Sequence, residues 1–370
     1  MSLVIGGGAV VAATGVRSGS VVLEGGSVAA VGDDRRTDLD ALGGWIVPGF
    51  IDLQINGAHG IDVTTQPTRI GELAAILPRY GVTAFVPTVV TAPPAVRSAA
   101  LAAWTQRRDG PGAVPLGLHL EGPMLAPTRR GAHRGEHLLV PAPDVVDGWS
   151  AAAGVVMATV APELPGALDV IATLTARGVV VALGHTDATA EEFAAGKSAG
   201  ARYVTHLFNA MRPFRHRDPG PIGAALADDS LVAGLICDGI HVDPGAVRMA
   251  WRALGPGRLN LVTDAVAALG ADSGRLGSDP LDVTGGAVRN AAGVLAGSVL
   301  SLDRAVRNLR AYTGCSVPEA VGTVTAVPAR LLGATERGDL AVGARADVTV
   351  LDRDLHVLAT IVGGEVAWRS

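Results

Sequence analysis

The chain has 370 residues, which is long for one small domain and suits one large barrel with a minor domain beside it. Hydrophobic residues make up 48% and charged residues 18% of the sequence, so a large core can form and global disorder is excluded. The net charge of −5 argues against non-specific nucleic-acid binding. It does not exclude an anionic substrate, because a local cluster of Arg and His can override a weak global field.

We expect neither a targeting signal nor a membrane-spanning segment. The first ten residues have no basic segment before their short apolar run, so we do not expect a signal peptide. No apolar run reaches the ~18 residues that a membrane span needs. The chain has two cysteines, Cys237 and Cys315, far apart in the sequence, and two thiols do not make a disulfide framework. A cytoplasmic location is therefore expected, and Cys237, within an apolar run, is interpreted as a core residue.

Both ends of the chain have a β pattern. Residues 1–47 and 336–370 contain short alternating apolar segments that Gly-Gly pairs interrupt, which predicts hairpins. We expect the two ends to fold together into one small β-sandwich domain. Residues 48–335 then form the second domain.

The middle of the chain alternates apolar runs with Ala-rich helical stretches, which indicates a parallel sheet buried on both faces. Eight such units predict an α/β fold, a TIM-type (β/α)8 barrel. The runs occupy residues 49–57, 83–91, 113–122, 155–163, 179–187, 202–211, 232–242 and 259–266. Each run ends in polar residues, and the carboxyl ends of barrel strands form the active-site face.

Three of these strand ends carry residues that bind metals. Glu121, His185 and His206 would supply one carboxylate and two imidazoles and leave a position free for water, as in catalytic zinc sites. Any one histidine alone is better explained as a core or loop residue, but three candidates at three strand ends favour a metal centre. Such a metal would lower the pKa of its water and polarise a carbonyl group.

The last run ends in Asp264, which we interpret as a general acid/base beside the metal. The alternative is a helix N-cap, a position that Asp also favours. His133 and His241 are each equally well explained as loop histidines without a task. Arg217 lies in a basic cluster with Arg212 and Arg215, which suits an anionic group, although a solvated loop is the alternative.

Other chemistries lack support in the sequence. The single lysine, Lys197, lies in a segment that reads as a helix, so a carboxylated lysine bridging two metals on a barrel strand is not expected. No nucleophile elbow, phosphate-binding loop or dinucleotide-binding motif occurs.

Several motifs together resemble the N-acetylglucosamine-6-phosphate deacetylases of the amidohydrolase superfamily. They run in order from residue 48 to residue 298, and the flanking β segments match as well. The motifs are PGFIDLQING, LHLEGPML, RRGAH, VAPE, LGHTDAT, VTHLFNAM, RDPGPIG, CDGIHV, LVTDAV and LAGS. The combination of HLEGP, GHTDAT and THLFNAM is specific to this family.

The resemblance implies a homodimer that hydrolyses N-acetyl-D-glucosamine 6-phosphate to D-glucosamine 6-phosphate and acetate, through a water that a single metal activates. It gives metal binding to Glu121, His185 and His206, and acid/base catalysis to Asp264. His133 is similar to the family's sugar contact, and Arg217 to an arginine that reaches the phosphate in the neighbouring subunit. The remaining substrate contacts that it implies are Ala132, Asn209, Ala210, His241, Leu295, Ala296 and Gly297.

The sequence departs from the wider superfamily at two places. Gln54 and Asn56 stand where amidohydrolases often carry His-x-His for a second metal, and amides bind zinc-like ions less well than imidazole. We therefore predict one divalent metal per subunit, with Zn²⁺ as the expected ion. Met124 stands where an aromatic residue is expected, which bears on the packing of its loop.

Two other functions stay open at this point. The first is a different amidohydrolase, such as a cyclic-amide hydrolase or a deaminase on the same barrel, because fold does not fix substrate. The second is a non-catalytic binding protein on the same scaffold.

Overall fold

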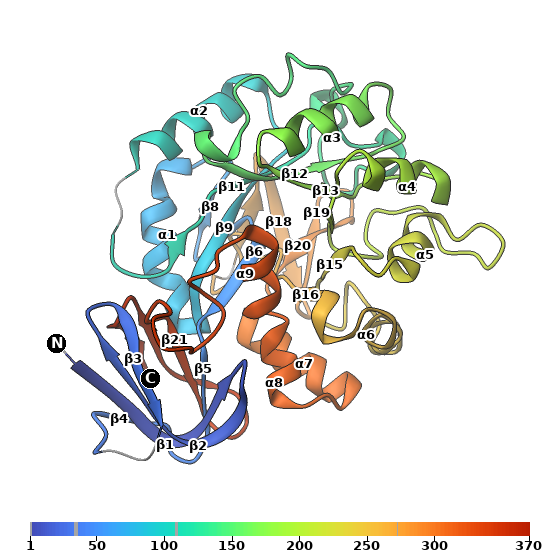
Figure 1. Ribbon diagram of the computed structural model, residues 1–370. Helices are drawn as coiled ribbons and strands as arrows, with labels where there is room; N and C mark the ends of the chain where they lie inside the picture. The colour runs from blue at the N-terminus through green and yellow to red at the C-terminus, as the bar shows by residue number, and fades with distance from the viewer. Residues whose placement is uncertain (1, 33–35, 108–109, 272) are drawn as a thin grey trace.

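The protein consists of a barrel ringed by helices and a smaller β domain that both termini build (Figure 1). The computed structural model describes residues 2–32, 36–107, 110–271 and 273–370. Residues 1 and 33–35 of the predicted N-terminal β segment lie outside the described residues. The predicted fold class is confirmed.

Eight parallel strands form the barrel, and each coincides with one of the eight predicted runs, although β9 begins one residue before its run. In barrel order the strands are β6 (Phe50–Ile55), β9 (Val82–Val90), β11 (Leu118–Glu121), β12 (Val155–Val160), β13 (Val180–Leu183), β14 (Tyr203–Val204), β15 (Val232–Leu235) and β16 (Leu259–Leu261). A parallel bridge between Ile55 and Ala265 connects the first strand to the segment after the last. The carboxyl ends of the strands therefore meet around one mouth.

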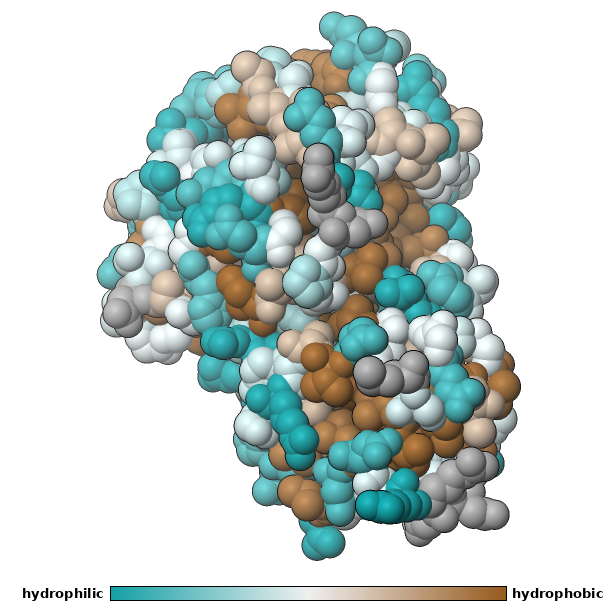
Figure 2. Space-filling model, turned by 90° about the vertical axis from the view of Figure 1, so that its left-hand side faces the viewer, coloured by the Kyte–Doolittle hydropathy of each residue, from teal (hydrophilic) through white to brown (hydrophobic). Residues whose placement is uncertain are grey.

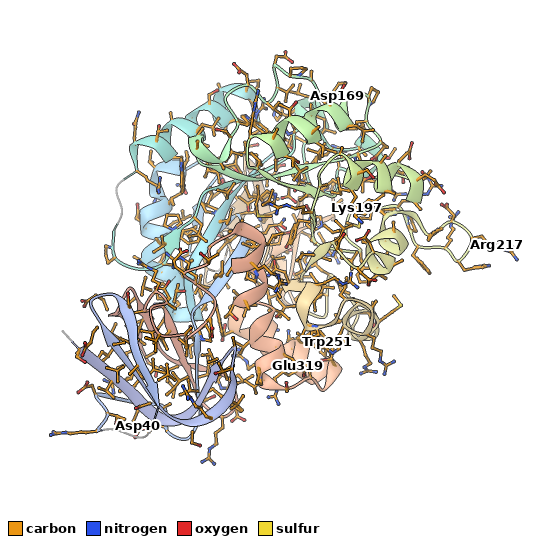
Figure 3. The ribbon with its side chains drawn as sticks, viewed as in Figure 1. Asp40, Asp169, Lys197, Arg217, Trp251 and Glu319 are labelled. Atoms are coloured by element: carbon orange, nitrogen blue, oxygen red, sulfur yellow. The ribbon has the colours of Figure 1, made fainter. Side chains whose placement is uncertain are left out.

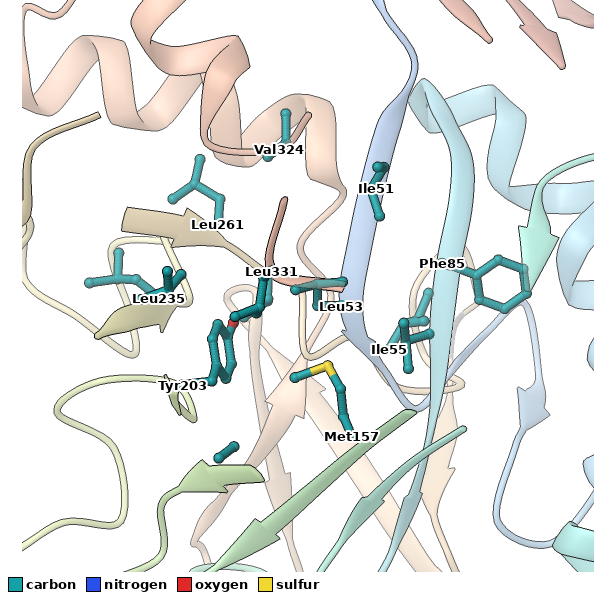
Figure 4. Close-up of a cluster of buried hydrophobic side chains, with 14 of the residues drawn as sticks. Ile51, Leu53, Ile55, Phe85, Met157, Tyr203, Leu235, Leu261, Val324 and Leu331 are labelled. Atoms are coloured by element: carbon teal, nitrogen blue, oxygen red, sulfur yellow. The ribbon is translucent and has the colours of Figure 1, made fainter. Parts of the chain in front are cut away.

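The apolar runs are continuous because the barrel strands are buried on both faces. Every residue of β6 and β9 is buried. Ile51, Leu53, Met157 and Tyr203 belong to one large core (Figure 4). The Tyr203 hydroxyl donates a 2.8 Å hydrogen bond to Asn260 Oδ1, so the polar atom of this buried ring is satisfied. This packed interior is a rigid base for the residues at the mouth.

Helices surround the barrel (Figure 1). They are α1 (Ile70–Ile76), α2 (Pro94–Gln106), α3 (Ala167–Ala176), α4 (Ala190–Ser198), α5 (Gly220–Ala227), α6 (Pro244–Arg258), α7 (Leu302–Thr313), α8 (Val317–Gly322) and α9 (Ala326–Leu332). The 3-10 turns are η1 (Pro67–Arg69), η2 (Leu77–Tyr80), η3 (Pro127–Arg129), η4 (Gly135–His137) and η5 (Ala151–Ala153). Lys197 lies in α4, as its sequence predicts, and forms an ion pair with Asp228. Of the helices described, none is long and apolar enough to cross a membrane.

The two ends of the chain share one mixed sheet, in which β5 pairs antiparallel with β21. Its strands are β1 (Ser2–Ala12), β2 (Gly15–Glu24), β3 (Ser27–Gly32), β4 (Leu39–Asp40), β5 (Trp45–Pro48), β21 (Val348–Leu351), β22 (Val357–Val362) and β23 (Glu365–Arg369). The sheet has its own core, which includes Ile5, Val21 and Ile361. It forms the smaller, lower lobe of the molecule in the turned view, where apolar and polar side chains are interspersed on the surface (Figure 2).

A four-stranded antiparallel sheet follows the last barrel strand, and the sequence pattern does not predict it. Its strands are β17 (Gly274–Leu276), β18 (Asp279–Thr284), β19 (Ala287–Asn290) and β20 (Leu295–Ser298). Only Leu281 is buried in β18, so the apolar signal along that strand is weak. The short strands β7 (Gly57–Ala58), β8 (Ile61–Asp62) and β10 (Val114–Pro115) complete the set.

Candidate metal centre

The three predicted metal ligands come together at the barrel mouth. Glu121 ends β11, His185 follows β13 and His206 follows β14, and all three are buried. Glu121 Oε1 lies 3.3 Å from His185 Nε2 and 3.1 Å from His206 Nε2, and the two Nε2 atoms are 3.1 Å apart. Ligand bonds of ~2.0–2.1 Å in a tetrahedral zinc site place neighbouring donor atoms about 3.3 Å apart. The spacing of these donor atoms therefore suits one shared cation.

Hydrogen bonding fixes how His185 faces its neighbours. Its Nδ1 lies 2.9 Å from the main-chain oxygen of Arg129, which can only accept, so Nδ1 carries the proton and Nε2 offers its lone pair. That lone pair points at the lone-pair-bearing oxygen of Glu121 and at His206 Nε2. Such a convergence of donor atoms is repulsive unless a proton or a cation lies between them. The residues present therefore fit a divalent metal.

The charge on Glu121 also suits a metal ligand. Burial alone would raise its pKa, but the adjacent imidazoles of His185 and His206 hold that pKa well below its ordinary value. The carboxylate is therefore ionised at neutral pH.

Backbone strain marks the same residues. His185, His206 and Asp264 have positive φ angles of 49°, 24° and 47°. Residues other than glycine seldom adopt this conformation, and it is concentrated at functional sites because surrounding contacts must hold it in place.

Asp264 lies beside the cluster in the same pocket. Its Oδ1 accepts hydrogen bonds from Asn56 Nδ2 at 2.7 Å and from Gln54 Nε2 at 3.2 Å. Burial, together with the charge of Glu121, raises its pKa to about 6. A carboxyl group with a pKa near neutrality can both take up and release a proton in one turnover.

Gln54 and Asn56, the pair that stands in place of His-x-His, turn their amide N–H groups toward carboxylates. Gln54 Nε2 donates to Glu121 Oε1 at 3.0 Å as well as to Asp264. These side chains therefore orient the two carboxylates. Within the described part of the chain, Glu121, His185 and His206 are the one group of three or more residues that could hold a metal ion.

His133 adds a neutral imidazole to the rim of the centre. Its Nδ1 accepts a 3.3 Å hydrogen bond from the main-chain N–H of Thr91, which leaves the proton on Nε2. Nε2 lies 3.9 Å from Glu121 Oε2, and the ring packs edge-on against His185 with the centroids 4.5 Å apart. Burial, followed by the neighbouring His185, lowers the pKa of His133 to about 3.

The pocket above these residues has a volume of about 190 Å³. Of the predicted substrate contacts, Ala132, His133, Asn209, Ala210, His241, Leu295 and Gly297 line it. Ala296 does not line the pocket, because its side chain packs in a small core with Val266. His241 Nδ1 bonds Asp238 Oδ2 at 2.7 Å, which holds the ring in place.

Arg217 lies outside this pocket. The structure places it at the end of a loop that projects from the barrel, with its side chain directed away from the protein (Figure 3). In the same loop, Arg212 pairs with Asp218 at 2.8 Å. Arg217 therefore does not reach the metal centre of its own chain.

Sequence reasoning did not single out several lining residues, among them Val90, Ile236, Leu276 and Val294. Leu276 and Val294 come from the unpredicted β17–β20 region. Gly131 also lines the pocket, and its place in the RRGAH motif could have signalled this. Met124 is fully buried, so an aliphatic side chain fills the position expected to be aromatic.

The model of the amidohydrolase family matches residues 45–367 of this sequence. The chain belongs to this family. It is 42% identical over 360 residues to the N-acetylglucosamine-6-phosphate deacetylase of Homo sapiens, covering 92% of this chain and 87% of that protein. It is 33% identical over 375 residues to the enzyme of that name from Bacillus subtilis (strain 168), covering 96% and 94%.

A solved structure agrees over the whole chain. It is a mutant of the N-acetyl-D-glucosamine-6-phosphate deacetylase of Mycobacterium smegmatis in complex with N-acetyl-D-glucosamine-6-phosphate. The two folds match with a TM-score of 0.93 at 36% identity, over 99% of each chain. The predicted family membership, in the deacetylase group of the amidohydrolases, is confirmed.

Proposed function

We propose that this protein hydrolyses N-acetyl-D-glucosamine 6-phosphate to D-glucosamine 6-phosphate and acetate. The observation that carries this proposal is the buried cluster of Glu121, His185 and His206, with Asp264 beside it in one pocket. The full-length similarity to deacetylases of that name supports the choice of substrate. The reaction breaks the amide C–N bond and joins the acyl carbon to the oxygen of water.

A divalent cation on Glu121, His185 and His206 would polarise the amide carbonyl and lower the pKa of a water molecule. Asp264 accepts the proton of the attacking water through the carboxylate that Asn56 and Gln54 hold in place. His133 Nε2–H donates a hydrogen bond to the carbonyl oxygen as negative charge develops there. Asp264 then delivers its proton to the departing amine.

The far side of the pocket is suited to the phosphate end of the substrate. Asn209 and Ala210 follow β14, and His241, which Asp238 orients, follows β15. We propose that a second copy of the chain supplies Arg217, because this arginine projects away from its own pocket (Figure 3). The active form is then a homodimer, and remote phosphate contacts position the amide for attack.

We further propose Zn²⁺ as the bound ion and the cytoplasm as the location. Two imidazoles and one carboxylate are a typical catalytic zinc set. Both cysteines, Cys237 and Cys315, are free and buried, which is compatible with a reducing compartment.

The test is release of acetate from N-acetylglucosamine 6-phosphate and from unphosphorylated N-acetylglucosamine, with zinc measured in the same sample. We expect about one zinc per chain and a kcat/KM that is at least ~100-fold higher with the phosphate, since its charged hydrogen bonds contribute ~1.5–3 kcal/mol each. Equal rates on both sugars, or hydrolysis of a cyclic amide instead, would refute the proposal.

A further inference from the structure

A second cavity adjoins the pocket of the metal centre. It has a volume of about 270 Å³, far above the ~10–15 Å³ that one water needs. The two cavities adjoin at four lining residues that they share: Val90, Ala132, His133 and Leu276. We call this second cavity the side chamber.

The side chamber lies across the barrel mouth from the region assigned to the phosphate. It is lined by Val90, Thr91 and Ala92 at the end of β9. In barrel order β9 is four strands from β14, which carries Asn209 beyond its end, so the two lie on opposite sides of an eight-stranded barrel. The metal centre lies at the same mouth, and Val90 and His133 line both its pocket and the side chamber.

The geometry of a hexose relates this arrangement of chamber, metal centre and phosphate region to the substrate. In a 2-acylamino hexose 6-phosphate, the amide on C2 and the phosphate on C6 lie at opposite ends of the ring. With the phosphate near Asn209 and the amide carbon at the metal centre, the acyl group points away from the phosphate, toward the side where the side chamber adjoins the pocket. This step rests on the function proposed above.

The chemistry of the chamber also suits an acyl chain. Val90, Ala92, Val96 and Leu276 give the chamber an apolar surface, beside the buried polar residues Thr64, Thr91 and His133. An ion pair between Arg134 and Asp279 lies at its outer rim, with Nε and Oδ1 3.0 Å apart. Methylene groups would therefore enter an apolar space behind the reacting carbonyl.

We propose that the side chamber is an acyl-chain subsite, so that the protein hydrolyses N-acyl-glucosamine 6-phosphates with acyl groups longer than acetyl. A closed acetyl pocket would reject each extra methylene by roughly 10- to 200-fold. A chamber of this size behind the carbonyl removes that penalty.

The experiment compares the N-acetyl, N-propionyl and N-butyryl forms of glucosamine 6-phosphate, with release of the free amine as the readout. We expect the wild-type kcat/KM for the butyryl form to lie within about tenfold of the acetyl value. Val96→Phe and Ser278→Leu fill the chamber from residues that do not line the metal-centre pocket. Each should lower kcat/KM for the butyryl form at least tenfold and leave the acetyl value within twofold.

The matched control is Ser98→Leu, because Ser98 is also exposed but lies on α2 outside the chamber lining. It should leave all three substrates unchanged. If the wild type cleaved the acetyl form but its kcat/KM for the butyryl form were more than 100-fold lower, the chamber proposal alone would be overturned. Chamber variants that lower both substrates equally would overturn it as well. If the wild type released no amine from the acetyl form, the proposed function would be refuted, and this inference, which rests on it, would be refuted as well.

Discussion

At the scale of single residues, the site depends on how two carboxylates in one pocket differ. Glu121 lies against two imidazoles, which keep its pKa low, whereas burial raises the pKa of Asp264 to about 6. The first group is therefore suited to hold a cation permanently, and the second to exchange protons. Different surroundings give the two carboxylates separate roles.

Asp264→Asn tests this division of roles. The amide keeps an oxygen that can accept from Asn56 Nδ2, so we expect the pocket to keep its shape and its metal. It cannot take a proton from water, so kcat should fall by about 10²- to 10⁴-fold. The measurement is steady-state kinetics together with metal analysis of the same preparation.

The control is Asp147→Asn, because Asp147 is exposed and does not line the pocket. It should leave both metal content and kcat unchanged. If Asp264→Asn retained wild-type turnover, Asp264 would not be the acid/base.

At the scale of elements, β6 carries a buried carboxyl group below the mouth. Asp52 Oδ2 accepts a 2.6 Å hydrogen bond from Thr263 Oγ1, and its Oδ1 accepts from the main-chain N–H groups of Gln54 and Thr263. These bonds connect β6 to the residue before Asp264. Burial nevertheless raises the pKa of Asp52 to about 7.

This raised pKa predicts a pH-dependent stability. The folded state holds a proton on Asp52 that the unfolded state releases near pH 3.8, so the stability it contributes is complete below that pH and is lost as the pH rises through about 7. Asp52→Asn cannot ionise, and Thr263 Oγ1 can accept from the new amide. We expect the variant to gain about 1–3 kcal/mol over wild type between pH 5 and pH 8.

Thermal unfolding of both proteins at the two pH values measures this difference. Asp354→Asn, at an exposed position, is the control and should follow the wild type at both. A Tm difference between Asp52→Asn and wild type that stays constant with pH would contradict the raised pKa.

The loop that carries Arg217 gives a second prediction at this scale. If the arginine acts across a dimer interface, Arg217→Ala should lower kcat/KM about 10- to 100-fold through loss of a charged hydrogen bond. Mixing this variant with Asp264→Asn then restores one complete site in each mixed dimer. Random exchange should recover about a quarter of wild-type activity.

The deciding comparison is between the activity of the mixed sample and the activity of each variant alone. An arginine that acts within its own chain gives no recovery on mixing. If the protein sedimented as a monomer, the premise that Arg217 acts across a dimer interface would be wrong.

At the scale of the whole molecule, the sequence predicts those features that each strand shows by itself, namely its burial and the polar residues at its end. Buried parallel strands need continuous apolar runs, so all eight could be found, and the polar residues at their ends marked Glu121, His185 and His206. Relations between distant segments leave no such local pattern. The β17–β20 sheet, the place of Leu276 in the pocket lining and the main-chain hydrogen bond that fixes His185 are visible only in the folded chain.

The metal centre also connects distant parts of the fold, because its ligands come from the ends of β11, β13 and β14. A cation that binds only the folded chain stabilises it by about 4 kcal/mol when its free concentration is 1,000 times Kd. Removing the metal with a chelator should therefore lower the Tm of the wild type by several degrees, and returning Zn²⁺ should restore it. Glu121→Gln lacks the charged ligand, so its Tm should respond to neither treatment. If a wild-type sample shown to contain metal melted at the same temperature after complete removal of that metal, the three side chains would not be holding a cation in the folded protein.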